Sequence, residues 1–261
     1  MIVKHCMIKR ITVSIVTIIL ISSFNKVENQ LLVKENTHSY SPRDSDFHSY
    51  DQLTNFLKTY VSADGRVNYG GIKKNSSRLS TIIQTFEHNF PNGDWSRNQK
   101  LAYWINTYNI YTIKLIVDNY PISSITKITA KPWDKKFIHL NGKTYSLNEI
   151  ENEIIRKQFN EPRIHFALNC ASASCPNLYN RAFKASSLSY QLTQQTKKFL
   201  ADKSKNDFSN TLDIKISKIF DWYKSDFTKQ ESVLDFINKY RNEKIKNPKI
   251  GYMEYSWELN K

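Results

Sequence analysis

Residues 97–119 read RNQKLAYWINTYNIYTIKLIVDN and form the most strongly patterned segment of the chain. Apolar and aromatic side chains recur along it at helical spacing, namely Leu101, Trp104, Ile105, Tyr108, Tyr111, Leu115 and Ile116. Pro121 follows, and proline cannot continue a helix because it lacks the backbone N–H. The segment therefore predicts a long helix over residues 97–119.

Two asparagines interrupt the apolar character of this helix. Asn106 and Asn109 are three residues apart, so they share a face. Asparagine is a poor helix former, and a structural or functional demand must therefore keep both residues there. We interpret them as candidate polar contacts to a substrate or to an oxyanion.

The segments on either side predict a chain dominated by helices. Helical periodicity recurs in the ranges 47–60, 72–87, 146–158, 188–201 and 233–240, and near residue 220. Strand patterns occur singly or as a hairpin, in the ranges 66–69, 137–145, 163–170 and 212–216 and in a final extended segment. Asn141-Gly142 marks the hairpin turn. This order predicts one α+β domain over residues 47–261, with helices packed on a small, mostly antiparallel sheet.

The first 24 residues have the layout of a secretory signal. Lys4, Lys9 and Arg10 precede an uncharged run over residues 11–21, and two serines follow it. This run is shorter than the roughly 20 residues of a stable membrane span. We therefore predict a cleaved signal peptide over 1–24, a flexible polar leader over 25–46, and export to the periplasm or the outside of the cell. A retained anchor is the alternative, whereas cleavage would leave no stable membrane span.

The bulk composition is that of a globular protein. The chain is 40% apolar and 13% aromatic, and its 6 glycines and 7 prolines argue against a repeat array. The formal net charge is +14, but lysines are spread through the chain, and no segment alternates aromatic residues with arginine as a nucleic-acid groove would. We expect no nucleic-acid partner and no cofactor, and we expect a monomer that takes a peptide or small-molecule ligand.

After export, Cys170 and Cys175 would be the remaining cysteines, in the sequence Cys-Ala-Ser-Ala-Ser-Cys-Pro. In one interpretation, a thiolate at the end of a buried strand acts as a nucleophile, because the strand fixes its position while the loop exposes the sulfur. In the other, the two residues form a disulfide, which an oxidising compartment permits. Two thiols without nearby partner ligands fall short of a metal site, so none is predicted.

His165 is the histidine nearest to this pair, and a thiol needs a neighbouring base or cation to ionise at neutral pH. In a continuous strand, His165 and Cys170 would be roughly 16 Å apart and on opposite faces. A catalytic pair therefore requires the chain to turn sharply by Asn169, or requires the loop to bring Cys175 back to His165. Both alternatives stay open at this point.

Three charged residues complete the candidate site. Ser146 and Glu149 fit a capping box, which gives Glu149 a structural role and leaves Glu151 as a possible orienter of the histidine. Arg156 and Arg163 could clamp a substrate carboxylate, or could be surface charges and helix-end partners.

Four ordered blocks of sequence resemble a known family. They are LAYWINTYN (101–109), LNEIENEIIR (147–156), EPRIHFALNCASASCP (161–176) and IFDWYKSDF (219–227), and they resemble the domain-of-unknown-function 547 family. The family-type positions are Trp104, Asn106, Asn109, Glu151, Arg156, Arg163, His165, Cys170, Trp222 and Asp226. The family pattern usually reads Glu-His at 151–152, whereas this chain has Asn152. The resemblance implies one exported domain without an established activity, and a papain-like or transglutaminase-like relation is the conjecture that accompanies it.

These observations lead to three functional hypotheses. The first is a cysteine-dependent hydrolase or acyltransferase for peptide or amide bonds, with Cys170 as nucleophile, His165 as base and Glu151 as orienter. The second is a non-catalytic exported binding domain with a Cys170–Cys175 disulfide. The third is thiol–disulfide exchange by the same two cysteines. The aromatic residues near 220 are interpreted as core, and Asp226 as a paired buried carboxylate or a helix cap.

Overall fold

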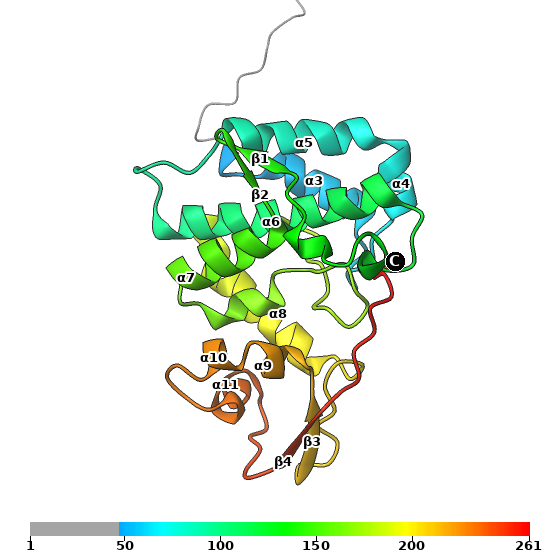
Figure 1. Ribbon diagram of the computed structural model, residues 1–261. Helices are drawn as coiled ribbons and strands as arrows, with labels where there is room; N and C mark the ends of the chain where they lie inside the picture. Colours follow the sequence, from blue (N-terminus) through cyan, green and yellow to red (C-terminus); the bar gives the residue numbers. More distant parts are fainter. Residues whose placement is uncertain (1–46) are drawn as a thin grey trace, which may run out of the picture. The chain divides into compact units, whose positions relative to one another are not determined.

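The computed structural model describes residues 47–261, so the predicted signal peptide and leader lie outside the described residues. The described chain consists of helices and two separate two-stranded ribbons (Figure 1), which confirms the α+β class. One ribbon is antiparallel and the other is parallel, in place of the one mostly antiparallel sheet that was expected. No helix in this part of the chain is long and apolar enough to cross a membrane.

Four helices form the first group of elements, and α6 is its longest. These are α3 (Asp51–Tyr60), α4 (Tyr69–Lys74), α5 (Ser76–His88) and α6 (Arg97–Asn119). The predicted bounds of α6 are confirmed, and a capping box of Ser96 and Gln99 begins it. Because other elements pack on all its sides, α6 is buried almost throughout. The helix predicted over 72–87 is divided at Asn75, and α4 already begins where a strand was expected.

A β-hairpin and a wide helical turn follow α6. Short 3₁₀ turns (Ile125–Lys127 and Pro132–Asp134) lead to β1 (Ile138–Leu140) and β2 (Lys143–Tyr145). Asn141 and Gly142 have positive φ angles of 47° and 73°, as the predicted hairpin turn requires. The capping box of Ser146 and Glu149 is formed, and it begins a π-helical segment (Glu149–Ile155) that continues into α7 (Arg156–Gln158).

The strand predicted over residues 163–170 is wrong. The chain forms a 3₁₀ helix over Pro162–Phe166 and then turns, because Pro162 suits a helical first turn and the Glu161 side chain accepts a bond from the Arg163 backbone N–H. The Asn109 amide then holds the turn: it donates to the Ala167 carbonyl and accepts from the Asn169 N–H, both at 2.9 Å. An asparagine that was predicted to contact substrate therefore shapes the backbone.

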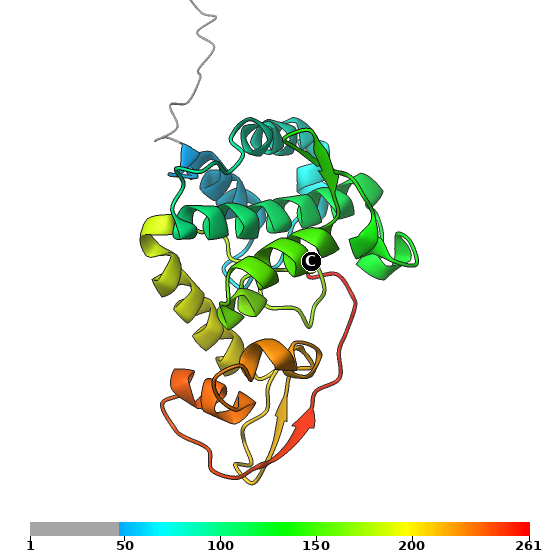
Figure 2. The ribbon, with the colours of Figure 1, turned by 60° about the vertical axis from the view of Figure 1, so that its left-hand side comes forward.

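The second group of elements lies below the first in Figures 1 and 2. A 3₁₀ turn (Ala185–Ser187) leads into α8 (Leu188–Ala201), and then follow β3 (Asp213–Ile216), α9 (Ile219–Trp222), α10 (Lys224–Phe227), α11 (Val233–Tyr240) and β4 (Lys249–Tyr252). Strands β3 and β4 pair in parallel, with Asp213 opposite Lys249 and Ile216 opposite Tyr252.

Each group has its own hydrophobic core, and the 3₁₀ helix over Pro162–Phe166 runs between them. Ile164 and Leu168 pack into the first core, whereas Phe166 packs into the second, against Phe199 and Phe227. The residues of this segment are thus fixed from both sides. Burial confirms the predicted core role of Phe220 and Phe227, but Trp222 is 46% exposed, so its predicted core role is wrong.

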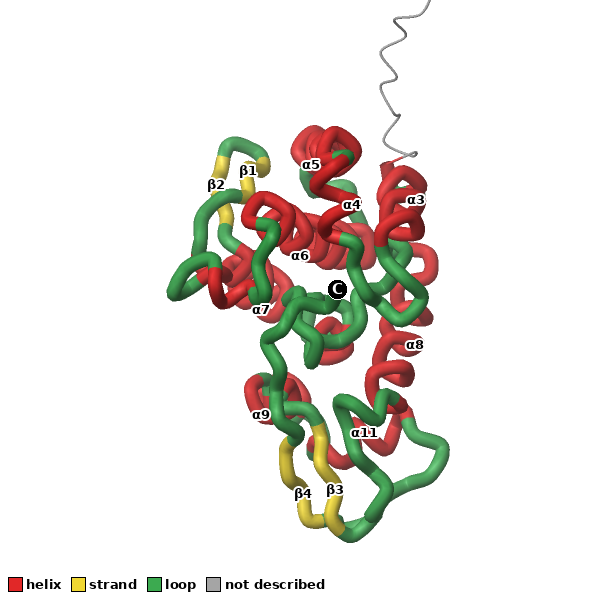
Figure 3. Tube along the Cα trace, turned by 90° about the vertical axis from the view of Figure 1, so that its right-hand side faces the viewer, coloured by secondary structure: helices red, strands yellow, loops and turns green. Residues whose placement is uncertain are grey.

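The C-terminal segment connects the two groups a second time. After β4 the chain runs back to the first group, as the red trace of Figure 1 and the loop above β4 in Figure 3 show. It pairs with the cysteine loop, where the Ala173 N–H donates to the Glu258 carbonyl at 2.7 Å. It also accepts a bond from the Val67 N–H at the Asn260 carbonyl, at 2.8 Å. We call residues 253–261 the C-terminal strap.

A glycine next to the cysteine loop gives a direct test of this packing. Gly65 has φ +84°, and a Cβ atom there would lie 2.6 Å from the Asn177 Cβ and 2.9 Å from the Leu178 N. We expect Gly65→Ala to lower the free energy of unfolding by about 2–4 kcal/mol, because strain and overlap add. Urea unfolding measures this. Gly93→Ala is the control, since nothing lies within 4 Å of its added Cβ, and equal effects of both variants would contradict the prediction.

Candidate active site

A cavity of about 450 Å³ lies between the two cores. It is lined by residues from both groups and from the strap, including Tyr108, Trp133, Glu151, His165, Cys170, Cys175, Trp222, Tyr223, Tyr255 and Trp257. Four predicted site residues, Glu151, His165, Cys170 and Cys175, therefore share one cavity. No strand positions these residues. The 3₁₀ helix carries His165, the turn and loop after it carry the two cysteines, and the π-helical segment carries Glu151.

The loop that carries the cysteines is held by its own side chains. Asn169 is buried; its side chain accepts from the Ala171 N–H at 2.9 Å and donates to the Pro176 carbonyl at 2.8 Å. Ala171 has a φ of 63°, in the left-handed region, and this reverses the chain directly after Cys170. The Ser172 hydroxyl accepts from the Cys175 N–H at 3.2 Å, which closes the loop.

The Cys170 thiol is half-buried and surrounded by hydrogen-bonding groups. Its sulfur lies 2.6 Å from the Cys175 sulfur, 3.2 Å from the Tyr255 hydroxyl and 3.4 Å from the Ser172 hydroxyl. Burial opposes ionisation, but the hydrogen bonds from Cys175, Ser172 and Tyr255 outweigh it and lower the pKa of Cys170 to about 7. The lowered pKa favours the Cys170 thiolate near neutral pH.

Cys175 has the opposite character. Its side chain is buried, and its sulfur accepts a bond from the Cys170 backbone N–H at 2.9 Å. Burial, together with the hydrogen bond to Cys170 and the charge there, raises the pKa of Cys175 well above its usual value. Cys175 therefore stays a thiol and donates to the Cys170 thiolate.

His165 is paired with Asp226. Its Nε2 lies 2.8 Å from the Asp226 Oδ2, and its ring stacks on Tyr223 with the centroids 3.9 Å apart. Burial acts against ionisation of Asp226, but the bonds to His165 and Arg156 prevail and hold the pKa of Asp226 well below its usual range. Within residues 47–261, no hydrogen bond joins His165 to either sulfur.

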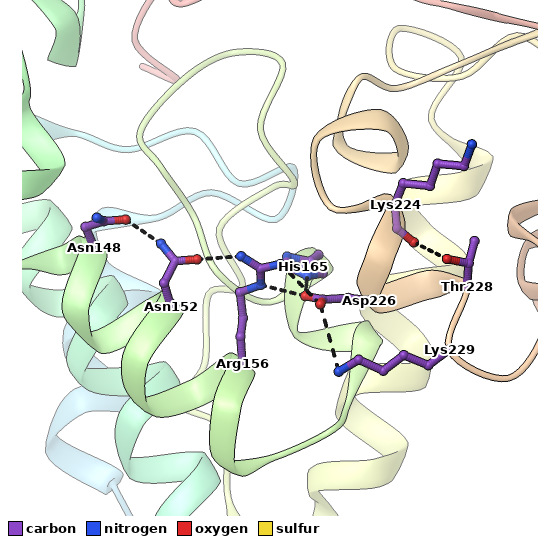
Figure 4. A network of polar contacts seen from close by, with 8 residues as sticks. All are labelled: Asn148, Asn152, Arg156, His165, Lys224, Asp226, Thr228 and Lys229. Carbon is purple, nitrogen blue, oxygen red and sulfur yellow. Dashed lines mark hydrogen bonds and ion pairs between the residues drawn. The ribbon is translucent and has the colours of Figure 1, made fainter.

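A chain of polar contacts fixes this carboxylate from the other side (Figure 4). The Arg156 Nε and Nη2 donate to the two Asp226 oxygens at 2.6 and 3.1 Å. The Arg156 Nη1 donates to the Asn152 Oδ1 at 2.6 Å, and Asn152 in turn donates to Asn148. Asn152 thus supports the arginine. Arg156 is engaged with a carboxylate of the protein itself and not with a substrate carboxylate, which was one of the two predicted alternatives.

Glu151 does not orient the histidine, because Asp226 occupies that place. Its side chain lines the cavity, is only 8% exposed, and is hydrogen-bonded to the Tyr223 hydroxyl. Burial and this carboxylate raise the pKa of Tyr223. Glu151 thus lines the cavity, but Asp226 and not Glu151 is the carboxylate that holds His165.

Three further predicted site residues lie outside the cavity lining. The Asn106 amide pairs with the backbone of Phe183, donating to its carbonyl at 2.8 Å and accepting from its N–H at 2.9 Å. Asn109 holds the turn before Cys170 in the same way. Arg163 binds Glu161 through Nε and Nη2, at 2.7 and 2.6 Å. All three position backbone or pair within the protein, and no substrate contact is assigned to them.

Sequence reasoning missed the aromatic part of the site. Tyr255 and Trp257 come from the strap, Trp222 ends α9, and Trp133 lies in the Pro132–Asp134 turn. The alternation Tyr-Ser-Trp at 255–257 was a usable signal, because residues two apart in an extended segment face the same side. The sequence could not predict that Trp133 and Trp222 line the same cavity as these two residues, because the rings come from three segments that are far apart along the chain.

Residues 93–200 match a family described as a protein of unknown function, DUF547. The matched part of the chain is thus similar to that family. It contains Glu151, His165, Cys170 and Cys175, and it ends before Asp226 and the strap. No curated protein and no solved structure matches the chain. The papain-like or transglutaminase-like relation stays a prediction.

The hydroxyl of Tyr255 gives a test of how the thiol is ionised. In Tyr255→Phe a donor to the thiolate is lost, so the pKa of Cys170 should rise, and its alkylation rate at pH 7 should fall about three- to tenfold. Alkylation rates measured from pH 5 to 10 give the midpoint, which is expected near 7 in the wild type. Tyr190→Phe is the control, because Tyr190 is 68% exposed and does not line the cavity. An unchanged midpoint in Tyr255→Phe would contradict the assignment.

Proposed function

We propose that this protein is an exported cysteine-dependent hydrolase or acyltransferase that acts on peptide or amide bonds, with Cys170 as the nucleophile. One observation carries the proposal. A half-buried thiol whose pKa is lowered to about 7 lines the same cavity as a buried histidine, and a carboxylate holds that histidine from outside the lining. Nucleophile, histidine and orienting carboxylate are the parts that acyl transfer through a thioester needs.

In the first step, the Cys170 thiolate attacks the amide carbonyl carbon. A C–S bond forms, the C–N bond breaks, and the leaving amine takes the Nδ1 proton of His165, which enters this step as an imidazolium and leaves it as a neutral imidazole. Because Cys170 ionises near neutral pH, the histidine is not needed to deprotonate it, which fits the absence of a bond between them among the described residues. Asp226 holds Nε2 and leaves Nδ1 as the nitrogen for proton transfer.

In the second step, His165 accepts a proton from the incoming nucleophile, which attacks the thioester carbonyl. The C–S bond breaks and the Cys170 thiolate is restored. Water as nucleophile gives hydrolysis, and an amine gives acyl transfer. Asp226 stabilises the imidazolium in both cases, because its carboxylate stays ionised between Arg156 and the ring.

Export is part of the proposal and rests on the sequence of residues 1–24, which lie outside the described residues. The positive residues, the short apolar run and the serines after it support a cleaved signal peptide.

Thiol labelling tests the catalytic proposal. We expect iodoacetamide to modify Cys170 in the reduced native protein, with a rate that rises through pH 7, and to leave the buried Cys175 unmodified. Peptide mass spectrometry identifies the modified residue. Cys170→Ala should abolish this modification of the native protein. Absence of labelling until denaturant is added would refute the nucleophile role of Cys170.

A second candidate function is an exported binding domain in which Cys170 and Cys175 form a disulfide. The observation that favours it is the 2.6 Å separation of the two sulfurs. It predicts that the protein purified from an oxidising compartment has lost two hydrogens by mass, and that a double Cys→Ser variant keeps ligand binding. A reduction potential near that of the compartment would instead favour thiol–disulfide exchange, and free thiols in the purified protein would count against both.

A further inference from the structure

Glu151 is the one carboxylate in residues 47–261 that is more than nine-tenths buried, at 8% exposure. It is also without an ion pair in this part of the chain, since no lysine, arginine or histidine nitrogen lies within 4 Å of it. Its hydrogen-bonding partner is the Tyr223 hydroxyl, a neutral group. A carboxylate removed from water needs compensation by a positive charge, and here the protein does not supply one in direct contact.

Two other carboxylates near this region are compensated. Asp226 is held by Arg156 and His165, and Glu161 is held by Arg163. Arg156 is the closest candidate cation for Glu151, but both of its Asp226 contacts and its Asn152 contact keep it turned toward α10. Arg156 thus interacts with Glu151 through charge alone, and no cation of the described residues contacts the Glu151 carboxylate directly.

The rings of Trp222, Tyr255, Trp257 and Trp133 line the same cavity, and we call them the aromatic wall. The Trp222 and Trp257 rings are nearly parallel, at 13°, with centroids 5.9 Å apart. Tyr255 lies 4.7 Å from Trp222 and 4.6 Å from Trp257, and Trp133 lies 5.4 Å from Trp257. Trp133 and Trp257 are partly buried and pack against the first core, whereas Trp222 is 46% exposed and presents ring surface to a ligand.

We propose that the aromatic wall and Glu151 bind a cationic amino or ammonium group of the ligand. This inference rests on the proposed function in one respect: it makes that group a feature of the substrate of Cys170. Aromatic faces attract a cation through the ring quadrupole, and a buried carboxylate adds a full negative charge.

The other charged side chains that line the cavity do not change the preference for a positively charged ligand. Lys131 and Asp134 also line it, but both are exposed, and their opposite charges are screened by water. An anionic ligand would face the buried carboxylate of Glu151 without compensation. A neutral ligand would bury Glu151 further and gain nothing from its charge. A volume of about 450 Å³ accommodates an aliphatic or aromatic amine.

The test compares two probes of nearly equal shape, 2-phenylethylammonium and 2-phenylethanol. NMR titration of the reduced full chain at pH 7 gives their dissociation constants. We expect the cation to bind at least about tenfold more tightly than the alcohol. Glu151→Gln should weaken the binding of the cation about tenfold or more, and Trp222→Leu, at an exposed position that tolerates substitution, should weaken it as well.

Glu153→Gln is the matched control, because Glu153 lies two residues away on the same helical segment, is exposed and pairs with Lys157. It should leave both constants unchanged. Equal affinity for the two probes, or unchanged binding of the cation in both Glu151→Gln and Trp222→Leu, would overturn the proposal.

Repeating the titration with Cys170→Ala separates this proposal from the catalytic one. If the cation still binds to Cys170→Ala, and iodoacetamide does not label Cys170 of the wild-type protein, the cation site is supported and the nucleophile role of Cys170 is refuted. Fast labelling of Cys170 in a protein that does not distinguish the probes refutes the cation site and supports the nucleophile.

Discussion

The carboxylate of Asp226 is the point at which the two halves of this structure are joined chemically. It belongs to α10 in the second group, yet its partner Arg156 begins α7 and its partner His165 lies in the 3₁₀ helix between the two cores. Desolvating a carboxylate is costly, and at Asp226 the bonds from Arg156 and His165 offset that cost. The ring of His165 is therefore fixed by charge on one edge and by stacking on Tyr223 on its face. These two contacts fix how the His165 ring lies in the wall of the cavity.

Much of the helical framework could be predicted, because its signals are local. The apolar repeat over 97–119 and the Asn141-Gly142 turn fix nearby backbone through periodicity and turn chemistry. The segment over 163–170 was misread as a strand because its apolar residues are divided between two cores. A run buried from both sides loses the alternation that separates helix from strand.

The candidate site could be predicted in part. His165 and Cys170 were identified because their residue types are rare and close in sequence, although the turn that unites them was not visible. Asp226 was predicted to be either a paired carboxylate or a helix cap. The sequence could not name its partners, because they are 61 and 70 residues away and spacing carries no information over such distances. Asn106 and Asn109 looked functional for a related reason: an amide buried in a helix has the same appearance whether it binds backbone or substrate.

The strap links the acidity of the thiol to the closure of the structure. Its Tyr255 hydroxyl is one of the donors that lower the pKa of Cys170. The same segment is held by backbone hydrogen bonds to the cysteine loop and to Val67. A local opening that released these bonds would withdraw the donor from the sulfur, so the acidity of Cys170 would report whether the strap is in place.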